Sequence, residues 1–205
     1  MSAAPTRKPR DAYHHGDLRG ALIQAAVRCA ESGGPEAVSF SALARTLGVT
    51  QAAPYRHFAD RDELLAAAAA EAFRMMQSEL RRAVARPSRR SPLARLARAY
   101  LAFGTRRVGL YRLMYAGRLI ERAPVGSELQ RAVEDGFLNT LDLFGPPEAD
   151  AARQRIALKL WASIHGVVML ADQGLLPLKV RKLTAEELVD QVVRDAEALI
   201  ASART

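Results

Sequence analysis

The chain has 205 residues, with 30 lysines and arginines, 22 aspartates and glutamates, and one cysteine. This length can bury one substantial core, with or without a small second domain, which excludes a disulfide-dependent mini-protein and a long repeat array. A single cysteine forms neither an internal disulfide nor a cysteine-rich zinc site, and no apolar run approaches the roughly 20 residues of a membrane span. The polar, basic N-terminus is not typical of a secretion signal. We therefore expect a cytoplasmic protein without a membrane partner.

The net charge of +8 at pH 7 makes a polyanion a plausible partner. The most basic stretch lies at residues 74–122 and not at the N-terminus. A solvated arginine surface is the simpler interpretation of that stretch. The basic charge of residues 74–122 weakly favours an anionic ligand.

Apolar residues recur with helical spacing along almost the whole chain, and no alternation of period two is long enough for a strand. The sequence therefore predicts an all-α fold of about nine helices. The first helix is expected from near Asp17 to the glycines at 33–34. A short second helix follows, with Ser39 as its N-cap and Gly48 at its end.

A third helix is predicted over residues 51–58, with Thr50 as its cap. Pro54 falls within its first turn, so we expect it to stiffen the helix start and not to break the helix. Asp60 and Glu63 then have the spacing of a capping box that opens a long helix ending before Pro87. Later helices are expected from Ser91–Pro92, around 110–115, over 127–145, from Pro146–Pro147 to Gly174, and after the capping box of Thr184 and Glu187.

Two short helices joined through Gly48 have the geometry of a helix-turn-helix, whose second helix enters the major groove of DNA. The segment 51–58 supports this interpretation, because it is polar or amphipathic and its alanines allow close approach to base edges. Together with its flanks, the segment 51–58 resembles the DNA-binding region of TetR-type transcriptional regulators. The resemblance rests on Ser39-Phe40-Ser41-Ala42-Leu43-Ala44-Arg45, Gly48-Val49-Thr50, Tyr55-Arg56-His57-Phe58 and Arg61-Asp62-Glu63-Leu64-Leu65.

The resemblance implies a role in DNA binding for ten residues. Phosphate or backbone contacts are implied for Ser39, Thr50, Tyr55, His57 and Arg61, base reading for Gln51, Ala52 and Arg56, and contacts at the groove edge for Ser41 and Arg45. Two alternatives stay open, because Tyr55 can act mainly in packing and Arg56 can be merely solvated. The family more often has an aliphatic residue at the position of Pro54 and a lysine at that of Arg61.

The N-terminal segment contains Arg7, Lys8 and Arg10, and it also resembles the start of many such regulators. A basic arm of this kind follows the DNA backbone or enters the minor groove, and a disordered terminus is the equal alternative. His14 and His15 lack a supporting cysteine or carboxylate cluster, so we predict no metal site. We also predict no cofactor.

The C-terminal part resembles one TetR subgroup, named for its Trp, His and Gly (WHG). The resemblance rests on Tyr100-Leu101-Ala102-Phe103, Leu110-Tyr111-Arg112-Leu113-Met114-Tyr115 and Trp161-Ala162-Ser163-Ile164-His165-Gly166. Six residues are candidates for lining an effector pocket: Phe103, Tyr111, Met114, Trp161, His165 and Met169. An ordinary core is the competing interpretation for each of them.

The resemblance as a whole implies a homodimeric regulator, a repressor that a small-molecule effector releases from a pseudo-palindromic operator. A DNA-binding domain over 1–60 would precede an effector-binding and dimerisation domain over 61–205, with the last two helices forming the dimer interface. A helical enzyme or carrier is a second hypothesis, but the sequence has no catalytic constellation, and we expect no enzyme. A nucleoid-type DNA binder without an effector is a third.

Overall fold

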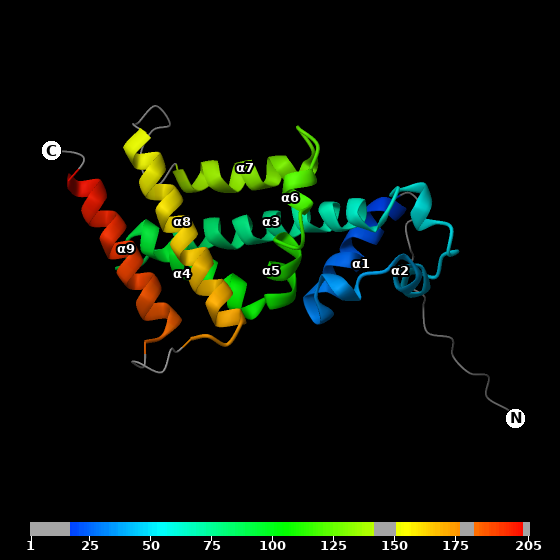
Figure 1. Cartoon of the computed structure of the whole chain (residues 1–205), viewed down its shortest axis with the longest axis horizontal. Helices are drawn as coiled ribbons and strands as arrows, with labels where there is room; N and C mark the ends of the chain where they lie inside the picture. Colours follow the sequence, from blue (N-terminus) through cyan, green and yellow to red (C-terminus); the bar gives the residue numbers. More distant parts are fainter. Residues whose placement is uncertain (1–16, 142–150, 177–182, 203–205) are drawn as a thin grey trace, which may run out of the picture.

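The computed structural model describes residues 17–141, 151–176 and 183–202. All regular elements in these ranges are helices, which confirms the all-α prediction. The helices form an elongated molecule, with α1 and α2 at one end and α8 and α9 at the other (Figure 1). None of the described helices is long and apolar enough to cross a membrane.

The first two helices begin and end as predicted. In α1 (Leu18–Gly33), the side chain of Asp17 accepts a hydrogen bond from the first turn, at 2.8 Å from the Gly20 nitrogen. In α2 (Phe40–Leu47), Ser39 is the N-cap and Gly48 ends the helix in the left-handed conformation, at φ 67°. That conformation is readily available to glycine, which has no side chain to clash with the backbone.

The predicted third helix over 51–58 is wrong as an α-helix. The structure has turns followed by a short 3₁₀ helix, Pro54–Arg56, which has no side-chain cap. The nitrogen of His57 donates to the carbonyl of Pro54 at 3.0 Å, a bond of the tighter 3₁₀ type. Pro54 has no N–H for the carbonyl of Thr50, and its ring crowds that carbonyl, so the α-helix does not form.

Helix α3 (Arg61–Ala85) connects the two ends of the molecule (Figure 1). Its predicted start is confirmed, because the Glu63 nitrogen donates to Asp60 Oδ1 at 2.8 Å and the Glu63 carboxylate accepts from the nitrogen of Ala59 at 2.6 Å. The helix packs against α1 near its beginning and against later helices along the rest of its length.

The remaining helices surround the far half of α3. They are α4 (Pro92–Arg106), α5 (Val108–Met114), α6 (Leu119–Arg122), α7 (Glu128–Leu141), α8 (Ala151–Asp172) and α9 (Ala185–Ser202). The short α6 was not predicted from the sequence. The expected capping box before α9 is confirmed by the Glu187 nitrogen, which donates to Thr184 Oγ1 at 3.2 Å. The expected helix end at Gly145 and start at Pro146–Pro147 lie outside the described residues.

Helix α5 lies directly against α1, so the two halves of the molecule share one contact region. Gly109 makes this approach possible, because a Cβ atom there would lie 2.1 Å from the carbonyl oxygen of Ala30. Beside it, Arg107 pairs with Glu31 of α1 and with Glu79 of α3, the latter at 3.2 Å. The C-terminal helices therefore contact α1 directly through α5.

Candidate functional sites

The segment that follows α2, residues 51–58, presents polar side chains to solvent and packs buried side chains against the core. Gln51 and Arg56 are exposed, and Tyr55 retains 62% of its accessible surface. Pro54 and Phe58 of the same segment are buried and hold it against the core. The side chains proposed to read bases are therefore available to a partner.

Packing against α2 orients Tyr55. Its ring centroid lies 4.6 Å from that of Phe40 at an interplanar angle of 81°, an edge-to-face pair. The ring is nevertheless mostly exposed. Tyr55 thus packs against α2 and still presents most of its side chain to solvent, where a partner can contact it.

The other predicted DNA-contacting residues lie along the same edge of the molecule. Four of them are exposed: Ser41, Arg45, Thr50 and Ala52. Ser39 and His57 are half-buried. Ser39 accepts from the nitrogen of Ala42 at 3.3 Å, so it caps α2, as predicted. Its role and that of the other residues in DNA binding stay predictions.

The guanidinium of Arg61 has a structural role that the sequence analysis missed. Its Nε donates to the carbonyl of Val38 at 2.8 Å, and a second nitrogen donates to the carbonyl of Pro35 at 2.5 Å. These carbonyls belong to the connection between α1 and α2, which includes a 3₁₀ helix, Pro35–Ala37. A lysine has one nitrogen in place of this fork and cannot reproduce the arrangement.

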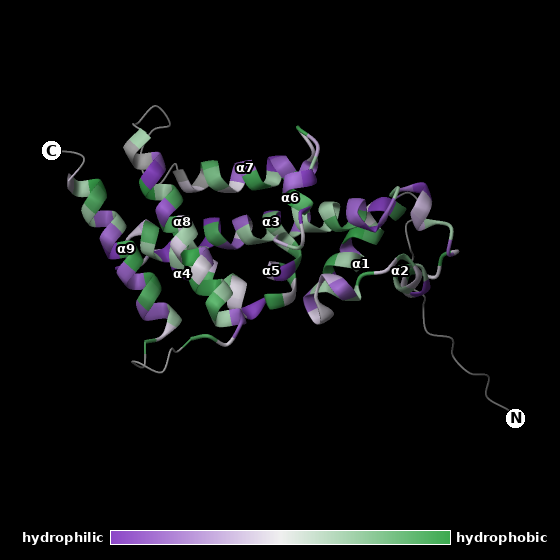
Figure 2. Ribbon diagram, viewed as in Figure 1, coloured by the Kyte–Doolittle hydropathy of each residue, from purple (hydrophilic) through white to green (hydrophobic). Residues whose placement is uncertain are grey.

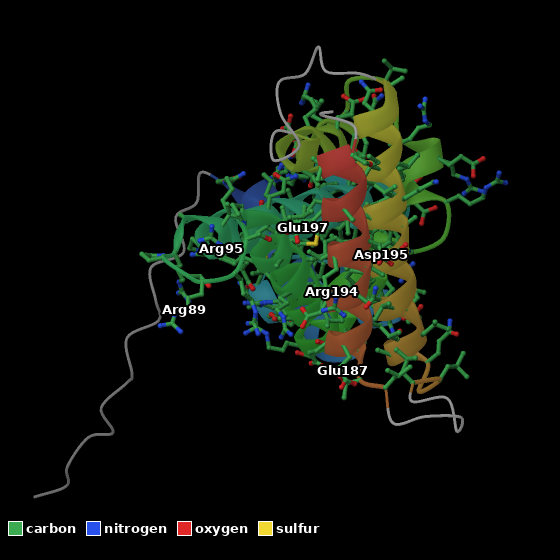
Figure 3. The ribbon with its side chains drawn as sticks, turned by 90° about the vertical axis from the view of Figure 1, so that its left-hand side faces the viewer. Arg89, Arg95, Glu187, Arg194, Asp195 and Glu197 are labelled. Atoms are coloured by element: carbon green, nitrogen blue, oxygen red, sulfur yellow. The ribbon has the colours of Figure 1, made fainter. Side chains whose placement is uncertain are left out.

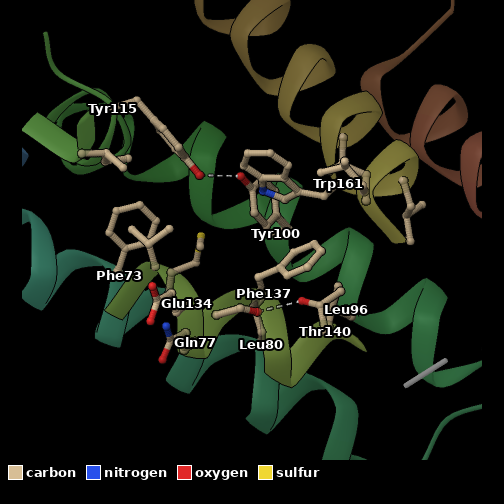
Figure 4. Close-up of a pocket in the computed structure, with 17 residues that line it drawn as sticks. Phe73, Gln77, Leu80, Leu96, Tyr100, Tyr115, Glu134, Phe137, Thr140 and Trp161 are labelled. Atoms are coloured by element: carbon tan, nitrogen blue, oxygen red, sulfur yellow. Dashed lines mark hydrogen bonds between the residues drawn. The ribbon is translucent and has the colours of Figure 1, made fainter. Parts of the chain in front are cut away.

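A cavity of about 410 Å³ lies between α3, α4, α7 and α8 (Figure 4). Its walls are mainly apolar, with Gln77, Glu134 and Thr140 among the few polar side chains. The aromatic lining residues are Phe73, Tyr100, Tyr115, Phe137 and Trp161. This volume is within the range of roughly 300–1,000 Å³ that is usual for small-molecule sites.

Five of the six residues expected to line this pocket do not line it. Trp161 is the exception and remains 37% exposed. Phe103 and Met114 are fully buried, and Met169 packs partly buried against the same core. The lining positions of α3 recur at helical spacing, so the sequence pattern could not distinguish them from core positions. They are Phe73, Met76, Gln77 and Leu80.

Tyr111 and His165 do not line the cavity themselves, but hydrogen bonds connect them to its lining residue Tyr100. The Tyr111 hydroxyl is 2.6 Å from Nδ1 of His165 and 3.1 Å from the hydroxyl of Tyr100. The Tyr100 hydroxyl is in turn 3.0 Å from that of Tyr115 (Figure 4). The Trp161 ring stacks on His165 with centroids 5.7 Å apart.

Burial controls the protonation of this group. It raises the pKa of Tyr100 and of Tyr115 well above the ordinary value of 10.0, so both hydroxyls are neutral at physiological pH. Burial also lowers the pKa of His165 below 6.5, which favours a neutral imidazole. The hydrogen-bonded chain therefore adds no net charge to the cavity wall.

No group of three or more potential metal ligands occurs in the parts of the chain that the structure describes. His14 and His15, for which the sequence predicted no metal site, lie outside those parts, as does the basic N-terminal arm.

The outer face of α8 is apolar and lies beside α9 (Figures 2 and 3). Leu158 and Leu170 are 50% and 39% exposed, and Ala162 between them is also exposed. Together with Gly166, these residues recur every four positions and form an apolar stripe along α8. A Cβ atom at Gly166 would meet no atom within 4 Å, so this glycine serves no close contact inside the subunit.

Two sequence-family models match the chain. The first, described as bacterial regulatory proteins of the tetR family, matches residues 22–68, and the second, described as a Tetracyclin repressor-like C-terminal domain, matches residues 93–196. The chain belongs to the TetR family. Membership in the WHG subgroup stays a prediction.

Solved structures show that other proteins share the fold of this TetR-family chain. A protein of unknown function from Rhodococcus sp. RHA1 is 30% identical, with a TM-score of 0.72 and coverage of 94% of this chain and 98% of that one. A TetR-like transcriptional regulator from the same organism is 20% identical, with a TM-score of 0.61 and coverage of 95% and 99%. A tetR-family transcriptional regulator from Streptomyces coelicolor is also 20% identical, with a TM-score of 0.56 and coverage of 90% and 81%. No curated protein matches the chain.

Proposed function

We propose that this TetR-family protein is a homodimeric repressor that binds an operator in double-stranded DNA and is released by a small-molecule effector. The observation that carries the proposal is the exposed segment around Gln51, Tyr55 and Arg56, presented by the turns and the 3₁₀ helix that follow α2. Residues 1–60 would form the DNA-binding domain, and residues 61–205 the effector-binding and dimerisation domain. The protein would act in the cytoplasm and have no catalytic activity.

Two copies of the segment would enter successive major grooves, about 34 Å apart on a pseudo-palindromic operator. Tyr55 and Ser39 would contact the backbone, while Gln51 and Arg56 would reach base edges. The 3₁₀ geometry at Pro54–Arg56 supports a short, rigid projection, since the buried side chains of Pro54 and Phe58 limit its motion.

The apolar stripe on α8 supports a dimer through α8 and α9. Leu158, Ala162, Gly166 and Leu170 would pack against the same stripe of a second copy, because a two-fold interface uses one patch twice. Gly166 would let the two helices approach closely. No close contact within the subunit accounts for a glycine at this position.

The cavity supports control by an effector, because α3 belongs to both functional regions. Phe73 and Leu80 line the cavity, while Arg61 at the start of the same helix holds the connection between α1 and α2. A ligand that favours one position of α3 would change the distance between the two copies of the segment 51–58 in the dimer. It would thereby favour the DNA-free state through its differential affinity for the two conformations.

Selection of genomic DNA fragments with the purified protein, followed by gel-shift titration, tests this proposal. We expect a fragment that binds at least about 10³-fold more tightly than random DNA at moderate salt. Uniform weak binding would instead support a nucleoid-type protein. Sedimentation of the free protein must show a dimer, and a monomer that binds no operator overturns the proposal.

A further inference from the structure

The cavity between α3, α4, α7 and α8 has an unusual charge for this protein. The whole chain carries +8, yet among the residues that the structure describes no lysine, arginine or histidine lines the cavity. The single carboxylate among the described lining residues is Glu134, on α7. Burying an anion without a positive partner is costly, and a nearby carboxylate adds repulsion. The walls therefore disfavour an anionic ligand, contrary to what the basic stretch 74–122 weakly favoured.

Aromatic rings contribute a large part of the remaining recognition surface. The rings of Phe73, Tyr100, Tyr115, Phe137 and Trp161 surround the space (Figure 4). The negative faces of such rings attract a cation, most strongly where it has lost its water. The neutral hydroxyls of Tyr100 and Tyr115 leave this preference intact.

Glu134 is available to a ligand. In the described residues, Glu128 on α7 pairs with Arg19 at 3.3 Å, and Glu71 on α3 pairs with Arg74 at 2.9 Å. No such pair involves Glu134, although it is exposed in a basic protein. Beside it, the amide nitrogen of Gln77 donates to the carbonyl of Ala132 at 2.5 Å, so its amide oxygen is the part left to accept a hydrogen bond.

We propose that the cavity binds a lipophilic monocation, with the apolar body among the aromatic rings and the positive charge near Glu134. The inference rests on the proposed effector function and specifies its ligand class. The net charge of the protein works against such a ligand, so a preference for cations must come from the cavity itself.

Two probes of nearly equal shape and opposite charge test the proposal on the full chain. Tetraphenylphosphonium is the cation and tetraphenylborate the anion, and N-phenyl-1-naphthylamine serves as a neutral apolar probe. Trp161 is the single tryptophan and lines the cavity, so its fluorescence reports binding there. We expect the cation to bind at least roughly tenfold more tightly than the anion at physiological salt. Equal or tighter binding of the anion overturns the proposal.

The variant Glu134→Gln removes the charge and keeps the shape of the side chain. It should weaken binding of tetraphenylphosphonium roughly threefold to fivefold, as expected for a partly exposed charge pair, and leave the neutral probe unchanged. Asp135→Asn is the matched control, because Asp135 is the next exposed carboxylate on α7 and does not line the cavity. Equal effects of the two variants on the cation contradict the proposal.

The same titrations separate this inference from the proposed function. If the neutral probe enters the cavity and releases operator DNA while the cation has no advantage, the ligand class is wrong and the effector site stands. If no probe changes the Trp161 fluorescence, both the ligand class and the effector role of the cavity are wrong. Operator binding is measured independently of either result.

Discussion

The hydroxyl of Tyr111 lies 2.6 Å from Nδ1 of His165 and so joins α5 to α8 across the core. The two rings have centroids 5.7 Å apart. Tyr111 is 2% exposed, whereas His165 is half-buried. The contact connects the helix that touches α1 with a helix of the proposed dimer face.

Protonation of His165 should reduce the stability of the fold. Its pKa in the folded protein is lowered by burial, while the unfolded chain has the ordinary value of 6.5. Above that value both states are neutral and stability is complete; below it the unfolded state binds the proton first, so stability falls until the folded pKa is passed. Urea unfolding at about pH 7.5 and about pH 5.5 measures this loss. His165→Gln should show a smaller loss, and an equal loss in both proteins contradicts the prediction.

The operator-contacting segment can be tested without disturbing its packing. Tyr55→Phe keeps the edge-to-face contact with Phe40 and removes only the hydroxyl, whereas Arg56→Ala removes an exposed charge. Each should weaken operator binding by about 1–2 kcal/mol, within the range for single contacts to DNA, with the dimer intact. Gel-shift titration measures the affinity, and Arg131→Ala on α7 is the control. Unchanged affinity in both variants would refute the assignment of this surface.

Arg61 should contribute to stability as well as to any DNA contact. Arg61→Lys keeps the charge but loses the simultaneous bonds to Pro35 and Val38, so we expect a loss of about 1 kcal/mol in the free energy of unfolding. Arg61→Ala should lose about 2 kcal/mol, because both carbonyls lose their partner. Urea denaturation provides both values. A lysine variant as stable as the wild type would show that the fork has no energetic role.

Gly109 should be intolerant of a side chain. Gly109→Ala places a methyl group against the carbonyls of Ala30 and Glu31, so α5 must move away from α1. We expect a destabilisation of about 1–3 kcal/mol, typical of an overpacked contact, in thermal or urea unfolding. A neutral effect would mean that α5 and α1 are less closely coupled than the structure shows.

Gly166 provides the opposite case. Gly166→Ala meets open space within the subunit and should stabilise the helix by up to about 1 kcal/mol. If a partner helix packs there, the same methyl group should weaken dimerisation roughly tenfold. Sedimentation over a range of concentrations measures the dimer constant. An unchanged constant would place the dimer contact elsewhere.

Much of the fold was predictable because its signals are local. The caps Ser39, Asp60 and Thr184 lie where the sequence predicted them, since a cap requires only a side chain and the backbone of the next turn. The third helix failed for a reason that is also local. Pro54 lacks the N–H that would bond to the carbonyl of Thr50, and its ring crowds that carbonyl, so a 3₁₀ helix forms in place of the α-helix.

The sequence by itself determined the helical class, most helix ends and the exposed polar segment at 51–57, because these depend on periodicity and on neighbours within a few residues. Tertiary structure alone decided which apolar faces enclose a cavity, that Arg61 reaches carbonyls more than 20 residues away, and that Glu134 stands unpaired beside aromatic rings. Core and cavity positions have the same helical spacing. They differ only in how closely the opposing helix approaches, and that distance is set by all the helices packing together.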